Sequence, residues 1–249
     1  VVQTMTAIEI EGLKKTYKSP FLRREVEGLR GLDLSVQSNE IYGFLGPNGA
    51  GKSTTIKILT GIIHPTAGTA RILGVSAWSV GAREQLGYMP EFPTFHDFLR
   101  TEEFLGFFGA LHGIQGEALG KRIEEVLEWV GLPGVMGQPL KTFSKGMLQR
   151  IGLAQAILHD PAVVILDEPM SGLDPMGRRD VRRLMEHLRT QGKTVMFSSH
   201  VLSDVEEVAD RICVLRQGQK VLEGRVDELL ADAKVERLED LFFLGEEAP

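Results

Sequence analysis

Cysteine is nearly absent from this chain, which contains only Cys213 among its 249 residues. One cysteine cannot form a disulfide within the chain, and its place in an apolar run predicts packing inside a strand. No apolar run approaches the length of about 20 residues that a membrane-spanning helix requires, and the N-terminal residues lack a basic segment followed by an apolar core. We therefore expect a soluble cytoplasmic protein that does not insert directly into a membrane.

A surplus of positive charge is also missing, because 34 acidic residues outnumber 28 lysines and arginines and leave a net charge of -6. Nucleic-acid binding requires a basic face that neutralises phosphates, so this balance argues against a nucleic-acid partner. Four arginines do cluster, and an exposed helix face explains them better than a DNA site. They are Arg178, Arg179, Arg182 and Arg183.

Two N-terminal segments alternate between apolar and polar residues, which is typical of strands with one buried face. Residues 7–13 alternate through Ile8 and Ile10, and residues 32–36 follow the same pattern. The charged connector 18–27 contains a proline and predicts an exposed loop between the two strands.

The rest of the chain has the pattern of an α/β protein. Short, β-branched apolar runs at 162–166 and 194–197 are typical of strands buried on both faces of a parallel sheet. Helical patterns separate these runs. Residues 101–158 form a long helical stretch interrupted by glycines and prolines, which predicts a helical insertion.

A further short strand at 41–45 leads into a glycine-rich segment and a helix, the context that the phosphate-binding loop Gly-x-x-x-x-Gly-Lys-Ser requires. Its backbone amides can cradle phosphates, the Lys52 ammonium can reach the β and γ oxygens, and the Ser53 hydroxyl can bind Mg²⁺. A plain glycine-rich turn is the weaker alternative. The sequence has no second loop of this kind and no internal repeat, which predicts one nucleotide-binding unit. The predicted loop residues are Gly46, Pro47, Asn48, Gly49, Ala50, Gly51, Lys52, Ser53 and Thr54.

Two other predicted strands end in groups suited to nucleotide chemistry. The run 163–166 delivers Asp167 and Glu168 to the edge where open α/β sheets bind ligands. Asp167 can hold Mg²⁺ through water, and Glu168 can polarise a water for attack on a γ-phosphate, although the pair could also simply open a turn. The run 194–197 leads to His200, a candidate γ-phosphate contact, but a lone histidine is more often structural.

Together, these motifs resemble the ABC ATPase family over nearly the whole chain. Residues 143–150 are similar to the family signature Leu-Ser-Gly-Gly-Gln and place Ser144 at a helix start, with Gly146 behind it. The resemblance implies that this helix end contacts the γ-phosphate held by an opposite subunit. Lys145 and Met147 replace a glycine and a glutamine and depart from the pattern, and Ser144 could be a helix cap only.

The resemblance assigns roles to three more residues. Asp174 closes the segment 171–174, which matches the family's loop at the dimer seam, with an ordinary turn as the alternative. Tyr17 stands where the family carries an aromatic that stacks on adenine, with strand packing as the alternative. Glu91 takes the place of the family's Q-loop glutamine, which implies catalytic and Mg²⁺-binding roles, with an exposed loop residue as the alternative.

The resemblance also implies a fold and a division of the chain. We expect an α/β protein with a P-loop NTPase (RecA-like) core and a mixed β-sheet, an N-terminal antiparallel β subdomain and an inserted α-helical subdomain over about 92–159. A single ABC ATPase domain would cover residues 1–225, and a C-terminal helical tail would cover 226–249. The tail segment 237–243 could pack as an amphipathic helix.

The function implied is that of an ATP-binding and ATP-hydrolysing subunit of an ABC transporter that uses Mg²⁺. It would form a homodimer or heterodimer of ABC ATPase subunits and drive a separate integral membrane permease from the inner face of the cell membrane. The Pro90–Glu91 pair and the segments 101–113 and 237–243 resemble ABC-2 type exporter ATPases, which implies export. An ABC ATPase acting on ribosomes or DNA is disfavoured by the single cassette without a coiled-coil insertion, and a non-hydrolysing sensor is disfavoured by Glu168 and His200.

Overall fold

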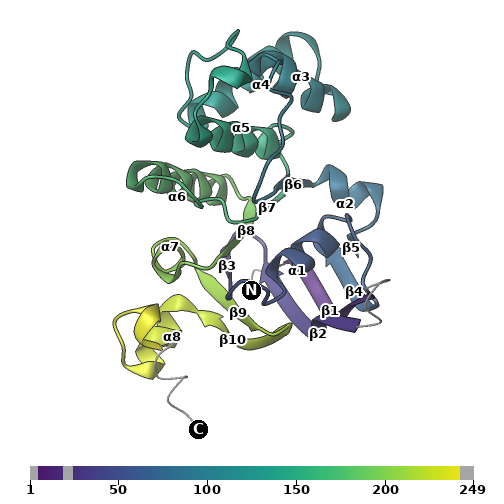
Figure 1. The fold of residues 1–249 in the computed structure, drawn as a ribbon, viewed down its shortest axis with the longest axis vertical. Coiled ribbons are helices and arrows are strands. Elements are labelled where there is room, and N and C mark those ends of the chain that lie inside the picture. The colour runs from purple at the N-terminus through teal and green to yellow at the C-terminus, as the bar shows by residue number, and fades with distance from the viewer. Residues whose placement is uncertain (1–4, 19–24, 242–249) are drawn as a thin grey trace.

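The computed structural model describes residues 5–18 and 25–241 and contains two β-sheets (Figure 1). The N-terminal sheet is antiparallel, with strand order β2-β1-β4-β5. Ile10 of β1 lies opposite Leu34 of β2 and both are buried, so the two predicted half-buried strands are confirmed. The strands of this sheet are β1 Thr6–Lys18, β2 Glu25–Gln37, β4 Ala67–Ile72 and β5 Val75–Ser76.

The loop predicted over residues 18–27 is wrong at both of its ends. β1 continues to Lys18 and β2 begins at Glu25, while Pro20 lies outside the described residues. Lys18 and Glu25 are partners in the ladder and form an exposed ion pair of 3.2 Å. Charged residues remain in the strands here because the ladder satisfies their backbone groups while their side chains stay in water.

The second sheet has the strand order β10-β9-β3-β8-β7-β6. Its strands from β9 to β6 are parallel, and β10 pairs antiparallel with β9. Every residue of β3, β7 and β8 is buried, as the apolar runs predicted, and Cys213 is buried in β9. The strands are β3 Ile41–Leu45, β6 Leu86–Met89, β7 Val163–Leu166, β8 Thr194–Ser199, β9 Arg211–Arg216 and β10 Gln219–Arg225.

This sheet separates two hydrophobic cores, because successive side chains of a strand point to opposite faces. Ile41 and Leu45 of β3 pack into the core shared with the helical part of the chain. Tyr42 and Phe44 pack into the core shared with the N-terminal sheet and the first helix. The helices outside the insertion are α1 Lys52–Leu59, α2 Val80–Glu84, α6 Pro175–Thr190, α7 Leu202–Glu206 and α8 Val226–Ala233.

The predicted helical stretch is present and stands apart from the N-terminal sheet, at the top of Figure 1. Its buried stripe on α4 consists of Ile123, Val126 and Leu127, at the spacing that the sequence indicated. The limits predicted for this subdomain and for the C-terminal tail stay predictions, and residues 242–249 lie outside the described residues. The elements are α3 Thr101–Leu111, α4 Gly116–Trp129, the 3₁₀ helix η1 Leu140–Thr142 and α5 Lys145–Ile157.

Parallel pairing brings the carboxyl ends of the central strands to one edge of the sheet. Leu45 at the end of β3 pairs with Ser199 at the end of β8, and Leu166 at the end of β7 pairs with Phe197. The chain segments that follow these strands therefore begin next to one another. This edge is where open α/β sheets bind ligands.

Candidate nucleotide-binding site

The glycine-rich loop after β3 turns sharply into α1, and two of its glycines are required by the geometry. Gly46 has φ 155° and Gly51 has φ 113°, a region that side chains other than glycine rarely adopt. A Cβ atom would lie 2.5 Å from the Leu215 carbonyl oxygen at Gly46 and 2.8 Å from the Gly28 carbonyl oxygen at Gly51. The loop is thus held tightly against the sheet, with its backbone exposed at Pro47, Asn48 and Gly49.

Lys52 begins α1 and is buried, with a side chain 6% exposed. Its ammonium donates to the Gly46 carbonyl oxygen at 2.6 Å and lies 3.5 Å from Oε1 of Glu168. A buried ammonium needs such partners because burial removes the hydration that stabilises its charge. The lysine is therefore held over the loop as a fixed positive charge.

Asp167 and Glu168 follow β7 and are both buried. The Ser198 hydroxyl at the end of β8 donates to Asp167 Oδ1 at 2.6 Å and accepts from the Glu168 amide at 2.9 Å. Glu168 has φ 50°, a left-handed conformation that is uncommon outside glycine and that often marks functional sites. Ser198 was not among the predicted site residues, and its position at the end of an apolar strand was the only available signal.

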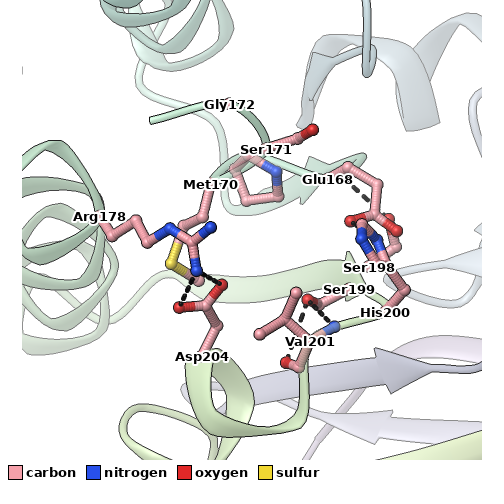
Figure 2. A pocket seen from close by; sticks show the side chains of 11 residues that line it. Glu168, Met170, Ser171, Gly172, Arg178, Ser198, Ser199, His200, Val201 and Asp204 are labelled. Carbon is pink, nitrogen blue, oxygen red and sulfur yellow. Dashed lines mark hydrogen bonds and ion pairs between the residues drawn. The ribbon is translucent and has the colours of Figure 1, made fainter. Parts of the chain in front are cut away.

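His200 and Glu168 face each other, as Figure 2 shows, with 2.9 Å between His200 Nδ1 and Glu168 Oε2. The Glu168 carboxylate thus lies between an ammonium on one oxygen and an imidazole on the other. The His200 side chain is 49% exposed, so its free ring nitrogen is available to the cleft. The structure therefore brings together Lys52, Glu168 and His200 from three separate strand ends.

Glu91 lies after β6, close to the other carboxylates of the site. Partial burial raises its pKa above the usual value, and the charges of Asp167 and Glu168 raise it further, while His200 and Lys52 oppose the shift. Burial is thus the main cause of the raised pKa, and the neighbouring carboxylates add to it. A cation placed among these carboxylates would relieve their repulsion.

Lys52, Glu91, Glu168 and His200 line one cleft of 190 Å³, whereas the predicted metal ligand Asp167 is buried outside its lining. Of the predicted loop residues, Ala50 is buried in the hydrophobic core and does not line the cleft, whereas Gly28 of β2 lines it but was not predicted. The lining consists of Gly28, Pro47, Asn48, Gly49, Gly51, Lys52, Ser53, Thr54, Glu91, Glu168 and His200.

The donors in and around this cleft fit Mg²⁺, which prefers hydroxyl, carboxylate and water oxygens. Ser53 is half-buried at the start of α1, and Asp167 stands at the end of β7 with one oxygen already bound by Ser198. No three His, Cys, Asp or Glu side chains within residues 5–18 and 25–241 cluster as a metal cage. A metal held here would therefore depend on Ser53 and phosphate oxygens for further ligands.

Tyr17 lies beside the cleft at the end of β1. Its hydroxyl forms a hydrogen bond of 3.1 Å with the Thr54 hydroxyl, and the residue is 40% exposed. A Cβ atom on Gly28 would approach within 2.9 Å of this ring, so the glycine leaves space for the tyrosine beside β2. The ring is therefore accessible for stacking next to the loop.

Ser144, Gly146 and Asp174 belong to a different groove of 470 Å³. Ser144 caps α5 by accepting from the Met147 amide at 3.3 Å, and Asp174 caps α6 by accepting from the Gly177 amide at 2.7 Å. Among the described residues, no residue lines both this groove and the cleft around Lys52. The sites predicted from the signature and from the phosphate loop are therefore separate surfaces of one chain.

The strand, glycine loop and helix around Lys52, on a parallel sheet that delivers Glu168 and His200, define a phosphate-loop nucleotide-binding protein. A family model described as "ABC transporter" matches residues 29–171. The chain belongs to the ABC transporter family of ATP-binding proteins. None of the helices in the described part of the chain has the length and apolar character needed to cross a membrane.

Two relatives with similar sequences are also named as ATP-binding proteins. An uncharacterized ABC transporter ATP-binding protein of Synechocystis sp. is 43% identical over 228 residues, which cover 90% of this chain and 64% of the relative. The Nod factor export ATP-binding protein I of Burkholderia lata is 37% identical over 204 residues, 81% of this chain and 67% of that protein. The chain therefore spans about two thirds of the length of these two relatives.

A solved structure described as an ATP binding subunit of an ABC transporter superimposes with a TM-score of 0.84 at 27% identity. The match covers 95% of this chain and 98% of that one. The predicted fold is therefore confirmed: an α/β cassette with an antiparallel N-terminal sheet, a mixed RecA-like sheet and a helical region.

Proposed function

We propose that this chain hydrolyses ATP with Mg²⁺ and that the hydrolysis drives export through a separate membrane-spanning subunit. The observation that carries the proposal is the contact series from Lys52 through Glu168 to His200 beside the phosphate loop. A buried carboxylate whose two oxygens are both held in place is suited to orient a water molecule at a fixed position. The loop beside it supplies backbone donors for phosphate oxygens.

In this mechanism each residue has one task. Lys52 binds the β and γ oxygens, while Ser53 and Asp167 would hold Mg²⁺, which neutralises phosphate charge when bound. Glu168 orients the attacking water and accepts its proton, and the His200 contact at 2.9 Å keeps the carboxylate turned toward the cleft. Glu91 presents a further oxygen to the same cleft.

We further propose that two cassettes pair head to tail, as a homodimer or with a similar subunit. The support is the position of Ser144 and Gly146 in an open groove away from Lys52. A helix start stabilises negative charge, and among the described residues none lines both this groove and the phosphate cleft. The γ-phosphate bound by one chain would then contact Ser144 and Gly146 of the other, with Asp174 at the seam.

Export through a membrane subunit is supported by the printed name of the Burkholderia relative and by exposed aromatic residues. Phe92, Phe98 and Phe107 are exposed on the segment after Glu91 and on α3, where apolar side chains are suited to a protein partner. This surface would place the chain at the cytoplasmic face of the membrane through its partner. Glu91 would connect that surface to the nucleotide cleft.

The test compares Glu168→Gln with the wild-type chain in phosphate release and in ATP binding. We expect turnover to fall by about 10³-fold with little change in ATP affinity, because the amide keeps the size of the side chain but cannot accept the proton. The variant should also accumulate as a dimer in size-exclusion chromatography when ATP and Mg²⁺ are present.

Glu186→Gln is the matched control, since Glu186 is exposed on α6. It makes the same chemical change outside the cleft and should leave turnover unchanged. Near-wild-type turnover in Glu168→Gln would remove Glu168 from the catalytic role. A wild-type chain that neither binds nor hydrolyses ATP would overturn the proposal as a whole.

A further inference from the structure

Asp204 is a buried carboxylate for which the mechanism above has no use. It lies on α7 with a side chain 6% exposed and lines a cavity of 70 Å³ beside Glu168 and His200 (Figure 2). A buried carboxylate remains charged at moderate cost only when it is paired. Its partners come from α6, with Arg178 Nη1 at 3.2 Å from Oδ2 and Arg182 Nη1 at 3.5 Å from Oδ1.

The two arginines differ in their other contacts. Arg178 Nε donates to the Leu173 carbonyl oxygen at 3.3 Å, in the turn just before Asp174. Arg182 Nη2 instead pairs with the more exposed Glu207 at 2.8 Å. Arg178 therefore connects three parts of the chain, the turn 171–174, α6 and α7, whereas Arg182 connects α6 to α7 and to Glu207 directly after it.

The backbone between His200 and Asp204 is short, and hydrogen bonds between neighbouring residues hold its first part. Ser199 Oγ accepts from the Val201 amide at 3.0 Å and donates to the Val201 carbonyl oxygen at 3.2 Å, immediately before α7 begins. Asp204 follows about one helical turn beyond His200. A shift of α7 would therefore move His200, whose half-exposed side chain is held at Glu168.

We propose that Asp204 and Arg178 are positioning residues for ATP hydrolysis, which hold His200 against Glu168 and link this contact to the turn 171–174. The inference rests on the proposed ATPase function. In the head-to-tail pair, the turn lies at the seam, and a second chain packing against it changes the Leu173 carbonyl to which Arg178 is bonded. The Arg178 guanidinium thereby couples the packing of a second chain against this turn to the position of His200.

The test exploits the difference between the two arginines. Arg178→Met and Arg182→Met each remove one ion pair to Asp204 and keep most of the apolar stem, so both should lower the unfolding temperature by similar amounts. Arg178→Met should lower kcat at least about tenfold with the KM for ATP within twofold, because a small misplacement of catalytic groups costs rate more than binding. Arg182→Met should keep kcat within about threefold, as expected for a group that does not contact the turn.

Two further variants separate positioning from stability. Arg178→Lys retains a charge for Asp204 but cannot reproduce the two-sided contact of the guanidinium, so its kcat should recover only partly. Asp204→Asn keeps the shape and one acceptor, and it should resemble Arg178→Met in kcat and remain folded. Equal kcat losses in Arg178→Met and Arg182→Met, or full recovery in Arg178→Lys, would overturn the positioning role.

Failure of this inference can be told apart from failure of the proposed function. Glu168→Gln is measured in the same assay and must abolish the wild-type activity if the chain is an ATPase of the kind proposed. An active wild type, an inactive Glu168→Gln and an Arg178→Met variant as active as Arg182→Met would reject only the role of Arg178. An inactive wild type that fails to bind ATP would reject both.

Discussion

Around Lys52, the functional groups are buried and already in contact with one another, whereas around Ser144 they stand at an open surface. Lys52 and Glu168 have side chains 6% and 8% exposed and lie 3.5 Å apart. Ser144 and Asp174 are exposed, and their side chains are engaged in capping the helices that follow them. The first region is assembled inside one chain, whereas the second lies exposed at the surface.

This difference shows which functional groups depend on tertiary packing for their position. Charges in a low-dielectric site act strongly on one another and must be positioned by packing before any ligand arrives. Backbone amides at a helix start need only the helix itself to be oriented. Substitutions should therefore have their largest effects in the cleft and smaller, partner-dependent effects in the groove.

The largest effect is expected from Lys52→Met, which removes the cation in the cleft and leaves Glu168 without one of its partners. Turnover should fall by about 10³-fold, and ATP affinity should fall with it, because the lysine contacts phosphate in both states. Phosphate release and calorimetric titration measure the two effects. Lys57→Met, at an exposed position on the same helix, should change neither.

Ser144→Arg should lower turnover by about 10²-fold while ATP affinity of the isolated chain stays within twofold, since this groove does not line the nucleotide cleft. Turnover per wild-type chain should rise with protein concentration. Ala118→Arg, exposed on α4, makes the same charge change away from the groove and serves as the control. Turnover per wild-type chain that does not depend on protein concentration would contradict the proposed role of the groove. The groove would then not act on the nucleotide of a second chain.

Substitutions of Glu91 test whether this residue couples the nucleotide cleft to the exposed surface on the segment that follows it. Glu91→Gln keeps an oxygen and should hold turnover within about tenfold, while Glu91→Ala should lose more. In the presence of the membrane partner, stimulation of hydrolysis by that partner should fall more in Glu91→Ala than basal turnover does. Full basal activity and full stimulation in Glu91→Ala would make the residue a solvated loop position.

Tyr17 is expected to have the smallest effect. Loss of the ring in Tyr17→Ala should weaken ATP binding by about fivefold, the equivalent of about 1 kcal/mol of stacking, without changing kcat. Tyr17→Phe keeps the ring and loses only the hydrogen bond to Thr54, so its affinity should stay within twofold of the wild type. Equal losses in the two variants would assign the effect to the hydrogen bond instead of the ring.

Local patterns explain why so much of the cassette could be predicted. The phosphate loop, the buried runs at β3, β7 and β8 and the stripe on α4 are each encoded within a short window, where spacing alone indicates burial and conformation. The prediction of a loop over residues 18–27 is wrong at its ends for a related reason, because it too relies on a short window of sequence. Its charged residues look like a loop until a partner strand supplies the ladder at Glu25.

Contacts between distant residues were not visible in this way. Ser198 binds both Asp167 and Glu168 across two neighbouring strands, and a serine at the end of an apolar run does not reveal which carboxylate it will meet. Arg178 was interpreted as part of an exposed basic helix face, yet it bonds to Leu173 and to the buried Asp204. The motif predicts Ala50 among the nucleotide contacts, yet its side chain packs into the hydrophobic core.

The sequence by itself determined the chemical groups of this protein and their order, because the glycine loop, the Asp167–Glu168 pair and the strands that carry them depend on neighbouring residues. The tertiary structure alone decided which groups meet. Parallel strand pairing places His200 2.9 Å from Glu168 while leaving Ser144 in a groove of its own. The physical reason is that register and packing, which set these distances, are properties of the whole sheet and its two cores and are not encoded in any single window.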